Sequence, residues 1–208
     1  MKEVSVSFLK EGSYEEYIKE INNTNADYIH FDVMDGKFVE RKNLKIKELK
    51  NLLSISKKKN DVHLMVKKPN KYIRSLKKYN TDYITVHFEI KNLDKTITKI
   101  KKQNKKVGIA INPETNIEKI YPYLNKIDLV LIMGEHPGKS GQKYLKETTD
   151  KINKLKEEIK NKKLNTKIEI DGGINEETLN EVVNADIVVS ASYILNDFSN
   201  IDKIKKVA

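Results

Sequence analysis

The feature that most constrains the fold is a regular alternation of short, β-branched apolar runs with lysine-rich amphipathic segments. Eight runs have the length and composition of strands: Val4–Leu9, Tyr28–Asp32, Asp61–Met65, Tyr83–Phe88, Lys106–Ile111, Leu129–Met133, Lys167–Asp171 and Ile187–Ser190. Helical patterns, with apolar residues three and four positions apart, lie between them at Tyr14–Ile21, Tyr72–Tyr79, Leu93–Ile100, Ile152–Ile159 and Leu179–Val183. This alternation indicates parallel strands joined by helices.

Eight strand–helix units within 208 residues predict an α/β fold, a (β/α)₈ TIM barrel. No linker or composition break divides the chain, so we expect residues 1–208 to form a single domain. The alternative is a doubly wound open sheet, which would usually carry a glycine-rich fingerprint after its first strand. The segment Leu9-Lys10-Glu11-Gly12 is not such a fingerprint.

Capping signals support the predicted helices. Ser13 with Glu16, and Thr115 with Glu118, have the spacing of a capping box, in which each side chain satisfies a free backbone N–H of the first turn. We therefore expect helices to begin after Ser13 and after Thr115.

Composition limits the class of protein. The chain has no cysteine and no run of 18 apolar residues, and its first residues lack a secretion signal, which favours a cytoplasmic protein without a membrane partner. The net charge of +10 comes from lysines spread through nearly every helix. This distribution is typical of a solvated surface, or of steering towards phosphorylated substrates, and we expect no nucleic-acid partner.

The carboxyl ends of the predicted strands carry potential metal ligands. His30 and Asp32 share one face of a strand, because side chains alternate along it. His63 lies at the end of the next strand, and Asp171 ends the seventh. Active sites of such barrels lie at these ends. Each residue alone could be structural, but together two imidazoles and two carboxylates suit one divalent ion, Zn²⁺, Fe²⁺, Mn²⁺ or Co²⁺.

Two loops on the same side of the barrel suit a phosphate. Gly172-Gly173 connects the seventh strand to a helix start, where backbone N–H groups and the helix dipole favour an anion. The segment Ser190-Ala191-Ser192 could complete the site after strand eight. The glycine-rich loop 134–143 after strand six is typical of a mobile cover, and we expect His136 within it to be a loop residue rather than a ligand.

Six ordered motifs make the sequence resemble the ribulose-phosphate 3-epimerase family from about Val4 to Leu195. They are His30-Phe31-Asp32-Val33-Met34-Asp35-Gly36, Asp61-Val62-His63-Leu64-Met65, Thr85-Val86-His87-Phe88-Glu89, Gly108-Ile109-Ala110-Ile111-Asn112-Pro113, Pro137-Gly138 with Gly141-Gln142-Lys143, and Ile168-Glu169-Ile170-Asp171-Gly172-Gly173.

The resemblance implies an isomerase that interconverts D-ribulose 5-phosphate and D-xylulose 5-phosphate through an enediolate. It implies that His30, Asp32, His63 and Asp171 bind the metal, and that Asp32 and Asp171 are the acid/base pair. It places the substrate against Ser7, His63, Gly138, Lys139, Ser140, Gly141, Asp171, Gly172, Gly173, Ala191 and Ser192. Met34, Met65 and Met133 would line the cavity. The chain could form a homo-oligomer.

The chain departs from the family pattern around the expected phosphate. Lys139-Ser140 stands where the family usually has Phe-Gly, and Ala191 where it has Gly. Ala191 can still offer its backbone N–H if its φ is negative. We expect Lys139 to add a mobile positive charge over the phosphate.

Three alternatives remain open from sequence. A sister epimerase of a hexulose 6-phosphate, such as allulose 6-phosphate, would share these motifs. A phosphate-binding barrel decarboxylase or aldolase is disfavoured, because Asp35-Gly36-Lys37 with Glu40 follows strand two rather than strand three. An inactive sugar-phosphate-binding barrel is disfavoured because the expected ligand set is complete.

Overall fold

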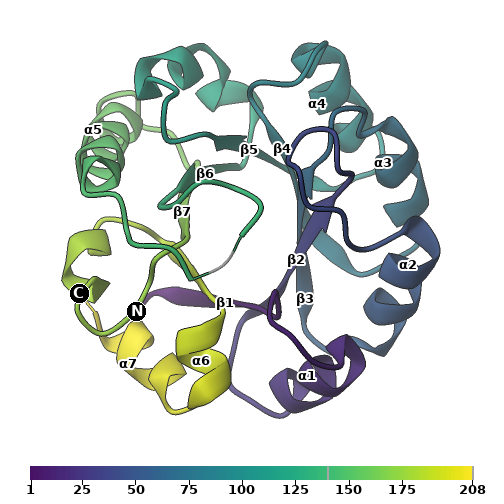
Figure 1. The fold of residues 1–208 in the computed structure, drawn as a ribbon. Helices are drawn as coiled ribbons and strands as arrows, with labels where there is room; N and C mark the ends of the chain where they lie inside the picture. The colour runs from purple at the N-terminus through teal and green to yellow at the C-terminus, as the bar shows by residue number, and fades with distance from the viewer. Residues whose placement is uncertain (140, 208) are drawn as a thin grey trace.

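The computed structural model describes residues 1–139 and 141–207, and its strands form one closed parallel barrel (Figure 1). The order around the barrel follows the chain: β1 (Glu3–Ser7), β2 (Tyr28–Met34), β3 (Lys59–Met65), β4 (Thr81–His87), β5 (Lys106–Ile111), β6 (Leu129–Met133), β7 (Lys167–Asp171) and β8 (Ile187–Ser190). Since β8 pairs with β1, the predicted barrel is confirmed.

Helices surround the barrel on its outside (Figure 1). They are α1 (Tyr14–Asn22), α2 (Ile46–Ile55), α3 (Asn70–Leu76), α4 (Leu93–Lys101), α5 (Glu147–Asn161), α6 (Ser192–Asn196) and α7 (Asn200–Lys206), with 3₁₀ helices η1 (Ile117–Lys126) and η2 (Leu179–Val182). No helix within the described chain is long and apolar enough to cross a membrane.

The helix starts confirm one capping prediction and correct the other. Ser13 caps α1, because its side chain accepts a hydrogen bond from the backbone N–H of Glu16. Thr115 does not cap the following helix, which begins after Asn116 without a side-chain cap. The hydroxyl of Thr115 instead donates to Glu89. The segment that follows is a 3₁₀ helix rather than an α-helix, and Pro122 inside it has no N–H to donate.

Because side chains alternate along each strand, the barrel has two separate buried regions, one between the sheet and the helices and one inside the barrel. On β2, Ile29, Phe31 and Val33 belong to the main apolar cluster, which packs between sheet and helices. The alternate residues point into the barrel. At its lower end Tyr28, Tyr83, Leu129 and Ile187, one from each even-numbered strand, form a buried layer. The polar residues of interest lie above this layer, towards the carboxyl ends.

Candidate active site

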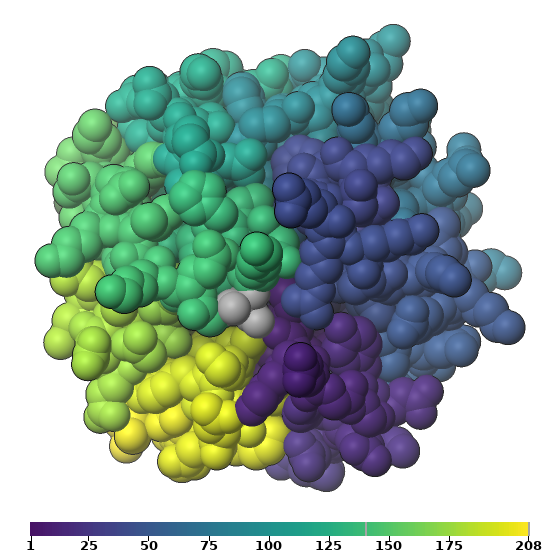
Figure 2. Space-filling model, viewed as in Figure 1, coloured from purple at the N-terminus to yellow at the C-terminus, as the bar shows by residue number. Residues whose placement is uncertain are grey.

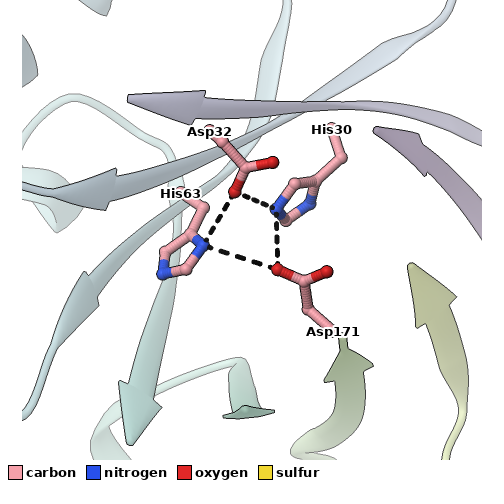
Figure 3. Close-up of side chains that lie close together, drawn as sticks. All are labelled: His30, Asp32, His63 and Asp171. Atoms are coloured by element: carbon pink, nitrogen blue, oxygen red, sulfur yellow. Dashed lines mark hydrogen bonds and ion pairs between the residues drawn. The ribbon is translucent and has the colours of Figure 1, made fainter. Parts of the chain in front are cut away.

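Four ligand-type side chains meet at the carboxyl ends of β2, β3 and β7 (Figure 3). Asp32 and His63 are direct neighbours in the β2–β3 register, and Nδ1 of His63 lies 3.3 Å from Oδ1 of Asp32. Nε2 of His30 lies 3.3 Å from the same oxygen. From across the barrel, Oδ2 of Asp171 approaches to 3.8 Å from His30 and 3.9 Å from His63. The four residues predicted from the sequence therefore come together.

The donor set fits a divalent metal ion. One ligand atom from each of the four residues lies within 4.8 Å of the others. Within the described chain, Nε2 of His30 is buried and has no hydrogen-bond partner. Two imidazole nitrogens and two carboxylate oxygens suit first-row transition ions and Zn²⁺. His30, Asp32, His63 and Asp171 could thus hold one such ion.

The two carboxyl groups of the cluster have opposite pKa shifts. Burial alone would raise the pKa of Asp32, but the charge of His30, followed by the close polar contacts that His30 and His63 make with its carboxylate, lowers it below its usual range. The Ser7 hydroxyl also donates to Asp32, over 2.8 Å. Burial, with the charge of Asp32 second, raises the pKa of Asp171 to about 8. Within the protein, two identical side chains thus prefer opposite protonation states at neutral pH.

A second buried layer lies directly beneath, and it was missed from the sequence. Oδ2 of Asp61 lies 2.6 Å from Nδ1 of His30, so that the Nδ1–H donates downward and Nε2 faces the cluster. Glu169 is also fully buried, with a ligand-type oxygen within 4.8 Å of His30 and Asp61. Both acids stand two residues before a predicted ligand, His63 or Asp171. Strand alternation would therefore have indicated them.

A cavity of about 320 Å³ opens above the cluster. It is lined by most of the residues expected to contact the substrate: Ser7, Gly138, Lys139, Gly141, Asp171, Gly172, Gly173, Ala191 and Ser192. His63 lies beneath it, fully buried. The described lining includes Met65 and Met133 but not Met34, which differs from our expectation. Met34 is instead covered, since it packs in a buried cluster with Leu9 and Met65 beneath Phe38 and Val39.

The glycine pair after β7 has the conformation predicted for a backbone anion site. Gly172 and Gly173 have φ of +109° and +70°, which side-chain-bearing residues rarely adopt. A Cβ on Gly173 would lie 2.6 Å from the backbone of Tyr144. Ala191, after β8, has a φ of −106°, so the negative φ that an alanine here requires is present.

A buried carboxylate, Glu135, stands against this glycine pair and had no signal in the sequence. It accepts hydrogen bonds from the backbone N–H of Gln142, over 3.0 Å, and from that of Gly173. Burial, with a smaller contribution from Asp32, raises the pKa of Glu135 to about 7. Glu135 joins the loop after β6 to the loop after β7.

The loop after β6 lies over the barrel opening (Figure 1), where the space-filling view shows it meeting the segment after β2 (Figure 2). The contact is close, because a Cβ on Gly138 would lie 3.1 Å from Cβ of Val39. Lys139 is exposed at the cavity rim, and Ser140 lies outside the described residues. His136 is exposed and pairs with Glu114 at 2.6 Å, away from the cluster.

Fold and site together define a class: (β/α)₈ barrels with a two-histidine, two-aspartate centre below a glycine-lined cavity. The sequence matches the ribulose-phosphate 3 epimerase family over residues 3–195. The chain therefore belongs to the ribulose-phosphate 3-epimerase family.

Individual relatives agree with this assignment. The ribulose-phosphate 3-epimerase of Synechocystis is 34% identical over 87% of this chain and 81% of its own length. That of Bacillus subtilis is 37% identical over 81% and 78%. Among solved structures, phosphoribosyl anthranilate isomerase from Thermococcus kodakaraensis superimposes with a TM-score of 0.69 over 100% of both chains. Its sequence identity of 14% means that this likeness concerns the fold alone.

Proposed function

We propose that this chain is a metal-dependent epimerase that interconverts D-ribulose 5-phosphate and D-xylulose 5-phosphate by two-base proton transfer at C3. The observation that carries the proposal is the convergence of Asp32 and Asp171. They come from β2 and β7, on different walls of the barrel, and approach the same two imidazoles within 3.3–3.9 Å. Membership of the family and the names of its relatives support the substrate.

Two carboxyl groups on opposite sides of the substrate are what inversion at one carbon requires. One aspartate removes the proton from one face of C3, and the other returns a proton to the opposite face of the planar enediolate. Ser7 holds the Asp32 carboxylate through the hydrogen bond to Oδ2, so that Oδ1 stays directed at the cluster. In the reverse reaction, Asp32 and Asp171 exchange the roles of acid and base.

His30, Asp32, His63 and Asp171 would hold the divalent ion, which we propose to be Zn²⁺, Fe²⁺, Mn²⁺ or Co²⁺, one per chain. When bound, such an ion supplies Lewis acidity that makes the C3–H bond more acidic and favours the enediolate. Met65 and Met133 line the adjacent cavity with polarisable apolar surface that offers no competing proton.

The phosphate would bind at the other side of the cavity. The backbone of Gly172 and Gly173 and the start of α6 at Ala191-Ser192 border it, and the loop with Gly138, Lys139 and Gly141 covers it. With the loop as its cover, the cavity would exclude water from the enediolate and so limit uncontrolled proton exchange.

Incubation with ribulose 5-phosphate in deuterated water tests the function. The metal-loaded chain should place deuterium at C3 of xylulose 5-phosphate, because the returning proton comes from a group that equilibrates with solvent. Exhaustive chelation should stop the exchange, and a divalent transition metal should restore it. A parallel incubation with allulose 6-phosphate measures the sugar preference. Metal-loaded protein that exchanges deuterium into neither ketose phosphate would refute the proposal.

A further inference from the structure

The motif Thr85-Val86-His87-Phe88-Glu89 has no part in the function proposed above, yet it ends next to the metal cluster. His87 is the last residue of β4 and is fully buried, with the ring of Phe38 packed over it at 4.4 Å between centroids. Its Nε2 lies 2.9 Å from Nε2 of His63. His87 therefore contacts the one ring nitrogen of His63 that does not face the cluster.

The other side of His87 faces a carboxylate. Nδ1 of His87 lies 3.3 Å from Oε2 of Glu89. The second oxygen, Oε1, accepts hydrogen bonds from the backbone N–H of Asn112, over 3.0 Å, and from the Thr115 hydroxyl. Burial would raise the pKa of Glu89, but these hydrogen bonds, with that from His87 first, lower it. Glu89 is thus an ionised group that can only accept hydrogen bonds.

These contacts favour one arrangement of the ring hydrogen atoms. Because Glu89 can only accept, the hydrogen of neutral His87 lies on Nδ1, and Nε2 of His87 carries a lone pair. His63 must then donate from its own Nε2–H across the 2.9 Å contact. In this tautomer its Nδ1, which lies 3.3 Å from Asp32 and 3.9 Å from Asp171, carries a lone pair towards the cluster, whereas in the metal-free chain the Asp32 carboxylate favours a hydrogen on Nδ1.

We propose that Glu89 and His87 are positioning residues that set the tautomer of His63, so that Nδ1 is free to bind the metal ion. The inference rests on the metal site in the proposed function and extends it to two residues outside the ligand set. It parallels the neighbouring ligand, where Asp61 accepts from Nδ1 of His30 over 2.6 Å. For His63 the corresponding carboxylate is that of Glu89, and the imidazole of His87 lies between them. Glu89 therefore lies outside the residues that line the cavity.

A second histidine–carboxylate pair provides a matched control. His136 and Glu114 lie 2.6 Å apart on the surface, with their side chains 59% and 66% exposed, and His136 contacts no member of the cluster in the described structure. Glu114→Gln removes the same charge from the same kind of pair as Glu89→Gln. Any effect of general charge or folding would appear in both variants.

The first test needs no metal. Nitrogen-15 NMR of the metal-free chain measures how the hydrogen of His63 divides between Nε2, which faces His87, and Nδ1, which faces Asp32. In Glu89→Gln, an NH₂ group that can only donate replaces one carboxylate oxygen, so either His87 or the Asn112 N–H loses its acceptor, and the Nδ1-protonated form of His63 should become more populated than in wild type. An Nδ1-protonated fraction that is the same in wild type and in Glu89→Gln would overturn the proposal.

The second test is titration with Co²⁺ alone, followed by calorimetry and by the visible spectrum of the bound ion. We expect Glu89→Gln and His87→Gln to bind Co²⁺ about 10- to 100-fold more weakly than wild type, the usual effect of losing such a partner. Glu114→Gln should bind like wild type. Equal affinities and spectra in all four proteins would refute the positioning role. Wild type that binds no Co²⁺ would refute the proposed metal site instead.

Discussion

The mouth of the barrel has two halves that are built differently. In the half formed by β1 to β4, the functional groups are side chains on strands, and His30, His63 and His87 are fully buried. In the half formed by β6 to β8, they are mostly backbone groups in loops, at glycines with positive φ. We call these the histidine half and the glycine half. Asp171 is the strand-end side chain that the glycine half contributes to the metal cluster.

This difference shows how one barrel can place the groups for proton transfer and metal binding in one half and the groups for phosphate binding in the other. Sheet register fixes each inward side chain of the histidine half, since Asp32 and His63 are paired neighbours. In the glycine half, the conformation of Gly172 and Gly173 depends on contacts with Glu135 and Tyr144 in another loop. Changes in the first half should therefore alter catalysis and metal binding, and changes in the second should alter affinity and stability.

Asp171→Asn should show the largest departure from this division, because Asp171 lies in the glycine half but has an acid/base role in the proposed reaction. We expect the turnover number to fall roughly 10³-fold or more, as loss of a general acid/base group does. Steady-state kinetics in both directions measures the effect, with Asp197→Asn on the surface as the control. Near-normal turnover would contradict the acid/base role.

Glu135→Gln should change how the unfolding free energy depends on pH, because Glu135 is the titratable group between the two loops of the glycine half. Burial in the folded chain raises the pKa of Glu135 from its usual 4.5 to about 7. The stability contributed by its protonated form is therefore complete below about pH 4.5 and is lost as the pH rises through about 7. Relative to wild type, the variant should gain on the order of 2 kcal/mol of unfolding free energy between pH 5 and pH 8.5.

Denaturant unfolding at the two pH values measures this gain. Glu147→Gln, at an exposed position, should show no such difference between the two pH values. A difference between Glu135→Gln and wild type that does not change with pH would mean that Glu135 is not held protonated near neutrality.

Lys139→Ala should have the smallest effect. Lys139 is exposed at the rim, and an exposed charge contributes about 0.2–1 kcal/mol, so the Michaelis constant should rise about twofold to fivefold with little change in turnover. Lys143→Ala, on the same loop but outside the cavity lining, is the matched control. Equal Michaelis constants in wild type and Lys139→Ala would remove the idea of a mobile charge over the phosphate.

The histidine half could be predicted from the sequence, because the positions of its side chains depend on alternation within single strands. Period-two alternation puts His30 and Asp32 on one face, and strand ends in a barrel share one rim. Strand bounds do not follow this division, because the four predicted strands with the observed bounds are β5 to β8: Lys106–Ile111, Leu129–Met133, Lys167–Asp171 and Ile187–Ser190.

What could not be predicted depends on contacts between segments distant in sequence. Thr115 has the spacing of a cap, yet the carboxylate of Glu89, which follows the end of β4, accepts the hydrogen bond from its hydroxyl. Met34 has the right strand face, but the loop after β2 covers it. Glu135 lies in a loop without periodicity, so only its docking against Gly173 shows that it is buried. The oligomeric state and the cytoplasmic location remain predictions.

The tyrosine layer at the lower end of the barrel has a consequence for the order of events in turnover. Tyr28 and Tyr83 are 1% and 2% exposed and, with Leu129 and Ile187, fill the cross-section below the cluster. A sugar phosphate can therefore enter only from the carboxyl ends of the strands, and the product must leave by the same route. The opening beside the loop after β6 thus serves both entry and exit, and each turnover must finish before another can begin.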